Sequence, residues 1–429
     1  EDFKHSSQTI FNHIGKKPRI IVWPYGQFND VAVQIARQAG MPHYFSLGEK
    51  IINKVGDKHI GRLLLNAETD LNTVKNYLDG IDESKQIQRV LHVDLDYVYD
   101  ADKAQQAKNL DKLIDRIYRY GVTTVYLQAF SDPDGDGVAD ALYFPNKYLP
   151  VRDDIFGRIA WQLQTRAGVQ VYAWMPVLAF DLRKGVKEAE YVIDSRTGKP
   201  STKAYLRLSP YNKQNVEIIK SIYNDLSFYA KFNGILFHDD AFLTDFEGAE
   251  GNHAEGMVSP QAKQKTQDLI QLTHQLTDAL KPYFLRGSYS LKTARNLYAS
   301  VITNPNAEEW LAQNLKTLTE NYDTTAIMAM PYMENEQPIS QEEAYQWFSS
   351  LIENVKAQAP LDKVLFEFQA VNWRTQKPIP ESELIDWMTL LQKNHIYSYG
   401  YYPDNFLTNQ PDLNKMKPYF SVNTNVGKP

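Results

Sequence analysis

The chain has 429 residues, with 46 Lys and Arg against 52 Asp and Glu, which gives a formal net charge of −6. This mildly acidic balance argues against a general phosphate-backbone binder, so no nucleic-acid partner is expected. The absence of cysteine excludes disulfides, thiolate metal sites and cysteine nucleophiles. Aromatic residues make up 12 % of the chain, with 27 Tyr and 19 Phe. Because Tyr and Trp side chains have a flat apolar face and a polar edge, they suit a groove that binds a polar, ring-shaped ligand.

The first 60 residues predict the end of an incomplete domain. A strand candidate runs into the turn Trp23-Pro24-Tyr25-Gly26, and a helix over Asp30–Ala39 and a short strand at Tyr44–Leu47 follow. These elements are too few to close a core of their own. We therefore expect residues 1–60 to belong to a domain whose larger part lies upstream, and residues 61–88 to form a polar linker.

From residue 89 to 410, β-rich runs alternate with amphipathic stretches of helix length, which is typical of parallel β/α units. Eight strands with seven intervening helices predict an α/β fold, a (β/α)8 TIM-like barrel with loop insertions, followed by a tail over 411–429. A doubly wound sheet is the alternative, but the Gly-rich turn of that fold is missing. The predicted strands are Arg89–Tyr97, Thr123–Phe130, Val169–Val177, Gly234–Asp239, Phe284–Ser290, Thr325–Met330, Lys363–Gln369 and Tyr397–Tyr402. The predicted helices lie near 104–119, 154–167, 212–230, 260–281, 307–319, 340–357 and 382–393.

Successive side chains of a barrel strand face the helices and the lumen in turn. Five of the predicted strands place polar or aromatic residues on the lumen side near their C-terminal ends, which form the active-site face of this fold. The pattern predicts a polar cleft, although any single residue could be a satisfied buried polar group. The inward residues are His92, Asp94 and Asp96, Tyr126 and Gln128, Tyr172 and Trp174, His238 and Asp240, and Glu367 and Gln369.

Two adjacent carboxylates, Asp239 and Asp240, end the fourth predicted strand. They repel each other, which can keep one protonated near neutral pH, as a general acid requires. Glycosidases place two carboxyl groups across the scissile bond. We interpret Asp240 as the acid, Asp239 or Asp96 as its ionised partner, and Glu367 as a carboxylate across the barrel. The alternative is that both acids cap the following helix.

Further polar and aromatic residues follow three predicted strands and would share the same rim. Arg295-Asn296 follows the fifth strand, Asn372-Trp373 the seventh, and Tyr401-Tyr402-Pro403-Asp404-Asn405 the eighth. Tyr and Trp faces stack on sugar rings, while Asp and Asn accept hydrogen bonds from hydroxyl or ammonium groups. An Asp-rich cleft without a matching basic cluster favours a neutral or cationic ligand.

The run Asp132-Pro133-Asp134-Gly135-Asp136-Gly137 is similar to the start of a calcium loop. The Glu required at the twelfth position is replaced by Tyr143, although Asp140 stands at the ninth. Bound Ca²⁺ at Asp132, Asp134 and Asp136 is therefore an alternative to a plain acidic turn.

Long motifs along nearly the whole chain carry a family resemblance. Together they resemble the periplasmic poly-β-1,6-N-acetyl-D-glucosamine de-N-acetylases of Gram-negative biofilm export. The motifs are His92-Val93-Asp94-Leu95-Asp96-Tyr97, Tyr126-Leu127-Gln128-Ala129-Phe130, Tyr172-Ala173-Trp174-Met175-Pro176-Val177, Phe237-His238-Asp239-Asp240, Met328-Ala329-Met330-Pro331-Tyr332 and Tyr399-Gly400-Tyr401-Tyr402-Pro403-Asp404-Asn405-Phe406.

The resemblance implies an N-terminal polysaccharide-deacetylase domain and a C-terminal barrel that binds, and in some members hydrolyses, the partially deacetylated polymer. Trp23-Pro24-Tyr25-Gly26 looks like a late motif of the deacetylase, so residues 1–60 would be its C-terminal remnant. The Asp base and the Asp-His-His site for a divalent metal would lie upstream, so this chain is not expected to deacetylate by itself, and the barrel needs no cofactor. The resemblance also implies a periplasmic, outer-membrane-associated protein, monomeric, with an export porin as partner.

The same motifs imply which residues contact the sugar. The acidic pair is Asp239 and Asp240, and an acidic, aromatic groove would select an ammonium sugar by charge-assisted hydrogen bonds and ring stacking. The predicted groove comprises Asp94, Asp96, Tyr126, Trp174, Tyr401, Asp404 and Asn405 from the motifs, with His238, Arg295 and Trp373 added from the strand ends.

Three functions are consistent with the sequence. The leading hypothesis is a glycoside hydrolase that cleaves β-1,6-linked glucosamine polymer. The second is a carbohydrate-binding export module of the deacetylase with little turnover. The third is a full deacetylase, which metal-dependent release of acetate would reveal.

Overall fold

The computed structural model describes residues 2–47, 53–62, 65, 87–183, 185–186, 189–201, 203–247, 258–281 and 291–422. The chain divides into two compact units, an N-terminal one and a larger one that begins at Ile87. Most of the predicted linker, residues 61–88, lies outside the described residues. Among the helices that are described, none is long and apolar enough to cross a membrane.

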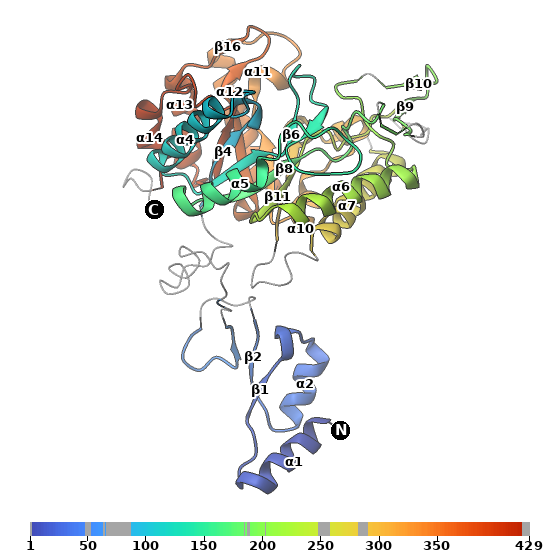
Figure 1. Cartoon of the computed structure of the whole chain (residues 1–429), viewed down its shortest axis with the longest axis vertical. Helices are drawn as coiled ribbons and strands as arrows, with labels where there is room; N and C mark the ends of the chain where they lie inside the picture. Colours follow the sequence, from blue (N-terminus) through green and yellow to red (C-terminus); the bar gives the residue numbers. More distant parts are fainter. Residues whose placement is uncertain are drawn as a thin grey trace. The chain divides into compact units, whose positions relative to one another are not determined.

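The N-terminal unit contains a parallel three-stranded sheet in the order β1-β2-β3. Its helix α2 begins after Asn29, whose side chain accepts the N–H of Ala32, and matches the predicted helix. Trp23 and Tyr44 are the large residues of a small core with Val33, Ala36 and Met41. The elements are α1 (Asp2–Ile14), β1 (Ile20–Val22), η1 (Pro24–Gly26), α2 (Asp30–Gln38), β2 (His43–Phe45) and β3 (His59–Ile60) (Figure 1).

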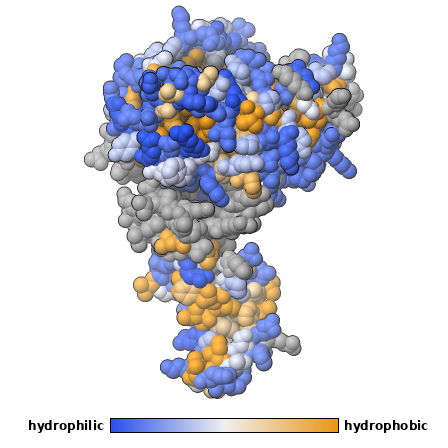
Figure 2. All heavy atoms as spheres, in the orientation of Figure 1, coloured by the Kyte–Doolittle hydropathy of each residue, from blue (hydrophilic) through white to orange (hydrophobic). Residues whose placement is uncertain are grey.

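Several apolar side chains of this unit face solvent, and Figure 2 shows hydrophobic residues on its surface. Ile14 is 66 % exposed and Val31 63 % exposed, and Ile20, Val22 and Ile35 are also exposed. Exposed apolar residues in such number are typical of a surface that another part of a protein can cover.

The larger unit is a closed barrel of eight parallel strands surrounded by helices (Figure 1), which confirms the predicted (β/α)8 fold. Most strand residues are buried, so the strands are rich in apolar residues, and most of their polar residues lie in the lumen or at the strand ends. In barrel order the strands are β4 (Arg89–Val93), β5 (Thr124–Gln128), β8 (Gln170–Met175), β11 (Gly234–Phe237), β12 (Lys292–Tyr298), β13 (Thr324–Met328), β14 (Val364–Gln369) and β17 (Tyr399–Tyr402).

The helices start and stop at sequence signals. The side chain of Asp102 caps the first barrel helix by accepting the N–H of Ala104, and Gly121 ends it with φ of 72°. Ser340 and Glu343 form a capping box. The helices are α4 (Lys103–Tyr120), α5 (Phe156–Gln162) with the turn η4 (Leu163–Ala167), α6 (Lys213–Tyr229), α7 (Pro260–Leu280), α8 (Ser300–Thr303), α9 (Glu308–Leu311), α10 (Leu315–Asn321), α11 (Pro331–Glu334), α12 (Gln341–Gln358), α13 (Glu381–Lys393) and α14 (Leu413–Phe420).

The fifth strand differs from the prediction. Residues 284–290, predicted as this strand, lie outside the described residues, and the barrel strand is Lys292–Tyr298. Arg295 and Asn296 therefore lie within β12 and not in a loop after it. The sequence of β12 lacks the apolar alternation that identified the other strands, because Arg295 occupies a position facing the helices.

The C-terminal segment also differs from the prediction of a tail over 411–429. Helix α14 follows β17 and packs on the barrel through Phe420, whose ring lies 5.2–5.6 Å from those of Tyr120, Tyr399 and Tyr401. Residues 413–420 thus complete the outer layer of helices as part of the barrel unit.

Candidate active site

Three neighbouring strand ends place unsatisfied polar atoms in one layer of the lumen. Gln128 and Trp174 are register partners on β5 and β8, and Asp94 directly follows β4, which pairs with β5. Asp94 Oδ1, Gln128 Oε1 and Trp174 Nε1 are buried and have no hydrogen-bond partner among the described residues. Because buried polar atoms are nearly always paired, these three atoms are available to a ligand.

Glu367 lies below this layer and is fully engaged. Its Oε1 accepts from His92 Nε2 at 2.7 Å and its Oε2 from Asn296 Nδ2 at 2.6 Å, and the residue is 1 % exposed. Tyr126, which packs edge-on against His92, is also fully buried. Glu367 and Tyr126 point into the lumen as predicted; both oxygens of Glu367 are taken, whereas the Tyr126 hydroxyl has no partner among the described residues.

Asp239 is the carboxylate that faces the tyrosines and histidine at the mouth of the barrel. Its Oδ2 accepts the hydroxyls of Tyr298 at 2.7 Å and Tyr205 at 2.8 Å, and its Oδ1 lies 2.8 Å from Nε2 of His238. Burial opposes ionisation, but the charge of His238 and these hydrogen bonds outweigh it and hold the pKa of Asp239 below its usual range. Asp239 is therefore ionised.

His238 is the cationic member of this cluster. Burial favours the neutral ring, but the carboxylates of Asp239 and Asp240 outweigh it and raise the pKa of His238 to about 10. Its Nδ1 has no hydrogen-bond partner among the described residues. This nitrogen lies 3.7 Å from Asp240 Oδ1, so the imidazolium is held by a carboxylate on each side.

Asp240 differs from a general acid in having no exposed surface, and so it cannot reach a sugar. It is fully buried, and its oxygens accept backbone N–H groups of three successive residues, Val177, Leu178 and Ala179, at 2.6–3.0 Å. β11 ends at Phe237, and beyond it Asp239 points toward the hydroxyls of Tyr205 and Tyr298 whereas Asp240 points toward the backbone after β8. The structure thus corrects the acid assignment: Asp240 anchors the loop after β8.

Glu334 was missed by the sequence analysis. It ends α11, the short helix after β13, and accepts the N–H groups of Ala299 at 2.8 Å and Ser300 at 3.1 Å. Burial raises the pKa of Glu334 to about 7, and the negative charge of Asp239 adds to this. The available sequence signal was an acid shortly after a strand end. Tyr298 was missed because the fifth strand was misplaced, whereas Asn296 was expected on the rim and instead lies within β12, where it donates to Glu367.

Aromatic rings connect the two sides of the cleft. Trp174 lies 5.3 Å from the rings of both Tyr402 and His238, and Trp373 stacks on Tyr402 at 6.1 Å. The hydroxyl of Tyr402 donates to Asp94 Oδ2 at 3.3 Å. Burial, with a contribution from Asp96, raises the pKa of Asp94 to about 7. Trp174 thus lies between Tyr402, which binds a carboxylate with a raised pKa, and His238, which binds the ionised Asp239.

Four predicted contacts of the sugar are engaged elsewhere. Tyr401 faces the helices and donates to Asp404 Oδ1 at 2.6 Å, while Arg116 of α4 binds both oxygens of Asp404. Asn405 accepts the N–H of Thr408 within a turn. Arg295 also faces the helices, where it binds Tyr322 and the carbonyl of Ala241. The prediction was wrong for the eighth strand because Tyr401 and Tyr402 place aromatic rings on both of its faces.

Asp96 and the acidic loop support the rim. Asp96 binds Arg152 and the hydroxyls of Tyr143 and Ser131, so its carboxylate is already committed. Tyr143 and the first residue of the acidic loop share this carboxylate, since the N–H of Asp132 donates to its other oxygen. The carboxylates of Asp132, Asp134 and Asp136 have oxygens within 4.8 Å of one another, and a Ca²⁺ ion there stays a prediction.

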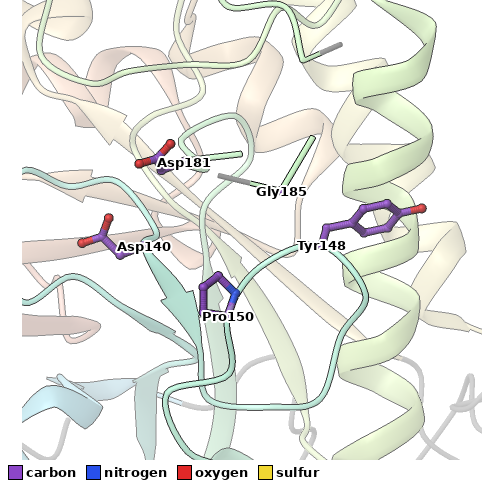
Figure 3. Close-up of a pocket in the computed structure, with 5 residues that line it drawn as sticks. All are labelled: Asp140, Tyr148, Pro150, Asp181 and Gly185. Carbon is purple, nitrogen blue, oxygen red and sulfur yellow. The ribbon is translucent and has the colours of Figure 1, made fainter. Parts of the chain in front are cut away.

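A separate cavity of about 220 Å³ lies on the rim between the loops after β5 and β8. Its lining includes Asp140, Tyr148 and Asp181; in Figure 3 the two carboxylates lie close together and the Tyr148 ring points away from them. Arg183 binds both oxygens of Asp181 at 2.8 Å. None of the predicted site residues lines this cavity.

Comparison with known proteins agrees with this architecture. Residues 92–402 match the hypothetical glycosyl hydrolase family 13. The chain is 39 % identical, over 94 % of its length, to proteins named poly-β-1,6-N-acetyl-D-glucosamine N-deacetylase from Escherichia coli K12 and Escherichia coli O157:H7. It spans 63 % of the length of these relatives.

A solved structure covers the barrel. The PgaB (BpsB) glycoside hydrolase domain from Bordetella bronchiseptica is 39 % identical, with a TM-score of 0.72, and the match covers 79 % of this chain and 100 % of that domain. The chain therefore belongs to the hypothetical glycosyl hydrolase family 13, and its barrel is a glycoside hydrolase-type domain similar to that of PgaB.

Proposed function

We propose that the barrel binds and hydrolyses partially de-N-acetylated poly-β-1,6-N-acetyl-D-glucosamine. The observation that carries this proposal is a pair of carboxyl groups at one barrel mouth whose surroundings separate their protonation states. Asp239 is held ionised, whereas the pKa of Glu334 is raised to about 7. Such separation is how glycosidases assign an acid and an ionised partner.

Glu334 would act as the general acid and protonate the glycosidic oxygen of the leaving sugar. Asp239 would stabilise the positive charge that develops on the sugar ring, with His238, Tyr205 and Tyr298 keeping it ionised. The two groups come from the ends of different strands, as is usual for this fold.

Asp94 and Gln128 would select the sugar. Their unpartnered oxygens accept hydrogen bonds, and an ammonium group is a donor with no acceptor. An ammonium sugar would also favour the ionised form of Asp94. Glucosamine units therefore suit this layer better than N-acetylated ones.

The same layer supports a second function, a non-catalytic binding and export module, because unpartnered acceptors beside Trp174 can bind a sugar without any chemistry. Incubation with partially de-N-acetylated polymer and mass spectrometry of the products separates the two. We expect the wild type to shorten the polymer and Glu334→Gln to slow this roughly 10²–10⁴-fold, the usual contribution of general acid catalysis.

The matched control is Glu336→Gln, two residues along on an exposed side chain, which should cleave like the wild type. A wild type that binds the polymer but leaves its length unchanged would establish the binding module. Metal-dependent release of acetate by this chain would instead support the deacetylase.

We further propose, from the family alone, that the parent protein works in the periplasm at the outer membrane, as a monomer that delivers polymer to an export porin. The exposed apolar residues of the N-terminal unit would be covered by the rest of a deacetylase domain. Fractionation of cells that produce the parent protein, followed by cross-linking, would test the location and the partner.

A further inference from the structure

We propose that Gly137 is a positioning residue for the candidate catalytic carboxylate: its bare backbone lets Tyr205 lie where the tyrosine hydroxyl donates to Asp239. The inference rests on the proposed function, because it assigns a support to the carboxylate placed there in the reaction. It concerns the loop after β5, which contributes no group to the chemistry.

The loop that carries Gly137 is held in one conformation by its own side chains. Asp132 accepts the N–H groups of Gly135 at 3.0 Å, Asp136 at 3.1 Å and Gly137 at 2.9 Å. The N–H of Asp132 in turn donates to Asp96 at 3.0 Å. Gly137 is therefore tied through Asp132 to Asp96, so moving the loop aside would break these hydrogen bonds.

Gly137 leaves no room for a side chain. A Cβ at this position would lie 2.0 Å from Cε1 and 2.5 Å from Cδ1 of Tyr205, well inside van der Waals contact. Its φ of +80° also belongs to the left-handed region that favours glycine. Any other residue would displace the ring of Tyr205.

The displaced ring would change the hydrogen bonding of Asp239. Tyr205 supplies one of two hydroxyls on Asp239 Oδ2, and donors to a carboxylate stabilise its ionised form. Loss of this donor should make Asp239 easier to protonate. The other titratable groups around Asp239 are His238, Asp240, Tyr298 and Glu334.

A matched control lies two residues away in the same loop. Gly135 has φ of +73°, but a Cβ there would meet no atom within 4 Å. Gly135→Ala therefore carries the same backbone strain as Gly137→Ala without touching Tyr205. A difference between the two variants isolates the contact with the ring.

The experiment compares the pH dependence of polymer cleavage for the wild type, Gly137→Ala, Gly135→Ala, Tyr205→Phe and the double variant Gly137→Ala/Tyr205→Phe. We expect Gly137→Ala and Tyr205→Phe each to move the acid limb to higher pH by roughly half to one unit, and the double variant to move it no further than Tyr205→Phe. Gly135→Ala should keep the wild-type limb. An unchanged limb in Tyr205→Phe, additive shifts in the double variant, or an equal shift in Gly135→Ala would overturn the proposal.

A titration without turnover separates this inference from the proposed function. Carbon-13 NMR of aspartate-labelled protein reports the pKa of Asp239, and Asp239→Asn identifies its signal. If the wild type cleaves no polymer but Tyr205→Phe and Gly137→Ala raise this pKa, the positioning role stands and the proposed function fails. If the wild type cleaves polymer and the pKa is unchanged in both variants, the positioning role is wrong.

Discussion

Two clusters of acid and tyrosine at the strand ends have opposite environments. Asp404 and Tyr401 lie between β17 and α4, where Arg116 binds both carboxylate oxygens and nothing is left for a ligand. Asp239 lies at the lumen mouth, close to Trp174 and His238 atoms that have no partner. Both carboxylates face a cation, Arg116 at Asp404 and His238 at Asp239, so the cation does not distinguish the clusters. The difference lies in the neighbouring polar atoms, because Trp174 Nε1 beside the inner cluster has no partner among the described residues and remains available to a ligand.

The largest expected effect concerns the cluster at the mouth. Asp239→Asn should reduce polymer cleavage by roughly 10²–10⁴-fold, because the ionised partner of the acid is lost. The variant keeps the size of the side chain, so its unfolding free energy should stay within about 2 kcal/mol of the wild type. Parallel assays of cleavage and urea unfolding would check both statements, and a folded variant with wild-type activity would remove Asp239 from the reaction.

The outer cluster should respond in the opposite way. Asp404→Ala leaves Arg116 buried without its partner, which costs roughly 3–5 kcal/mol of unfolding free energy. The double variant Arg116→Met/Asp404→Leu should recover a large part of this loss, since it leaves no unpaired charge. Urea denaturation of the three proteins measures this. Equal stability of Asp404→Ala and the wild type would show that the pair is dispensable.

Asp94 should destabilise the fold at neutral and higher pH. The pKa of Asp94 is about 7 in the folded protein and 3.8 for the unperturbed group, so the folded protein holds the proton more tightly. Protonated Asp94 therefore stabilises the fold fully below pH 4, and this stabilisation is lost as pH rises through 7. Asp94→Asn should therefore be more stable than the wild type at pH 8 by roughly 2–4 kcal/mol, and similar to it at pH 4. Asp115→Asn, on an exposed face of α4, is the control that should not change the pH dependence. Parallel stability curves for wild type and Asp94→Asn would contradict the raised pKa.

The smallest predicted effect is a fall in the rate of polymer cleavage on the alkaline side of the pH profile. Glu334 is protonated below a pKa of about 7, so a reaction that needs its proton should lose activity as pH rises above 7, about tenfold per unit. Asp239, with its lowered pKa, should sustain activity well below pH 7. A pH profile of polymer cleavage tests this, and a basic limb above pH 9 would point to another acid.

Much of the barrel could be predicted from the sequence because seven strands carry apolar residues toward the helices in regular alternation. The fifth could not, because Arg295 faces the helices there and is satisfied by Tyr322 and a backbone carbonyl. Only the folded barrel brings these partners together. The sequence pattern therefore predicted the fifth strand at residues 284–290, and this prediction was wrong.

Only part of the candidate site could be predicted from the sequence, because strand alternation does not extend to the loops. Alternation located Trp174 inside β8 and Asp94 and His238 one residue beyond their strands, but farther beyond Phe237 it gave the wrong member of the acidic pair. Glu334 belongs to no strand, and its raised pKa arises from burial in the folded protein. Side-chain direction in loops and protonation state depend on tertiary contacts, which residue spacing does not contain.

The most direct test of the contrast between the two clusters is the rate of polymer shortening per folded molecule in Asp239→Asn and Asp404→Asn, measured by mass spectrometry at a temperature where both are folded. We expect Asp239→Asn to be folded and inactive, and Asp404→Asn to be less stable but close to wild-type activity per folded molecule. Wild-type cleavage by Asp239→Asn, together with loss of cleavage in folded Asp404→Asn, would contradict the account.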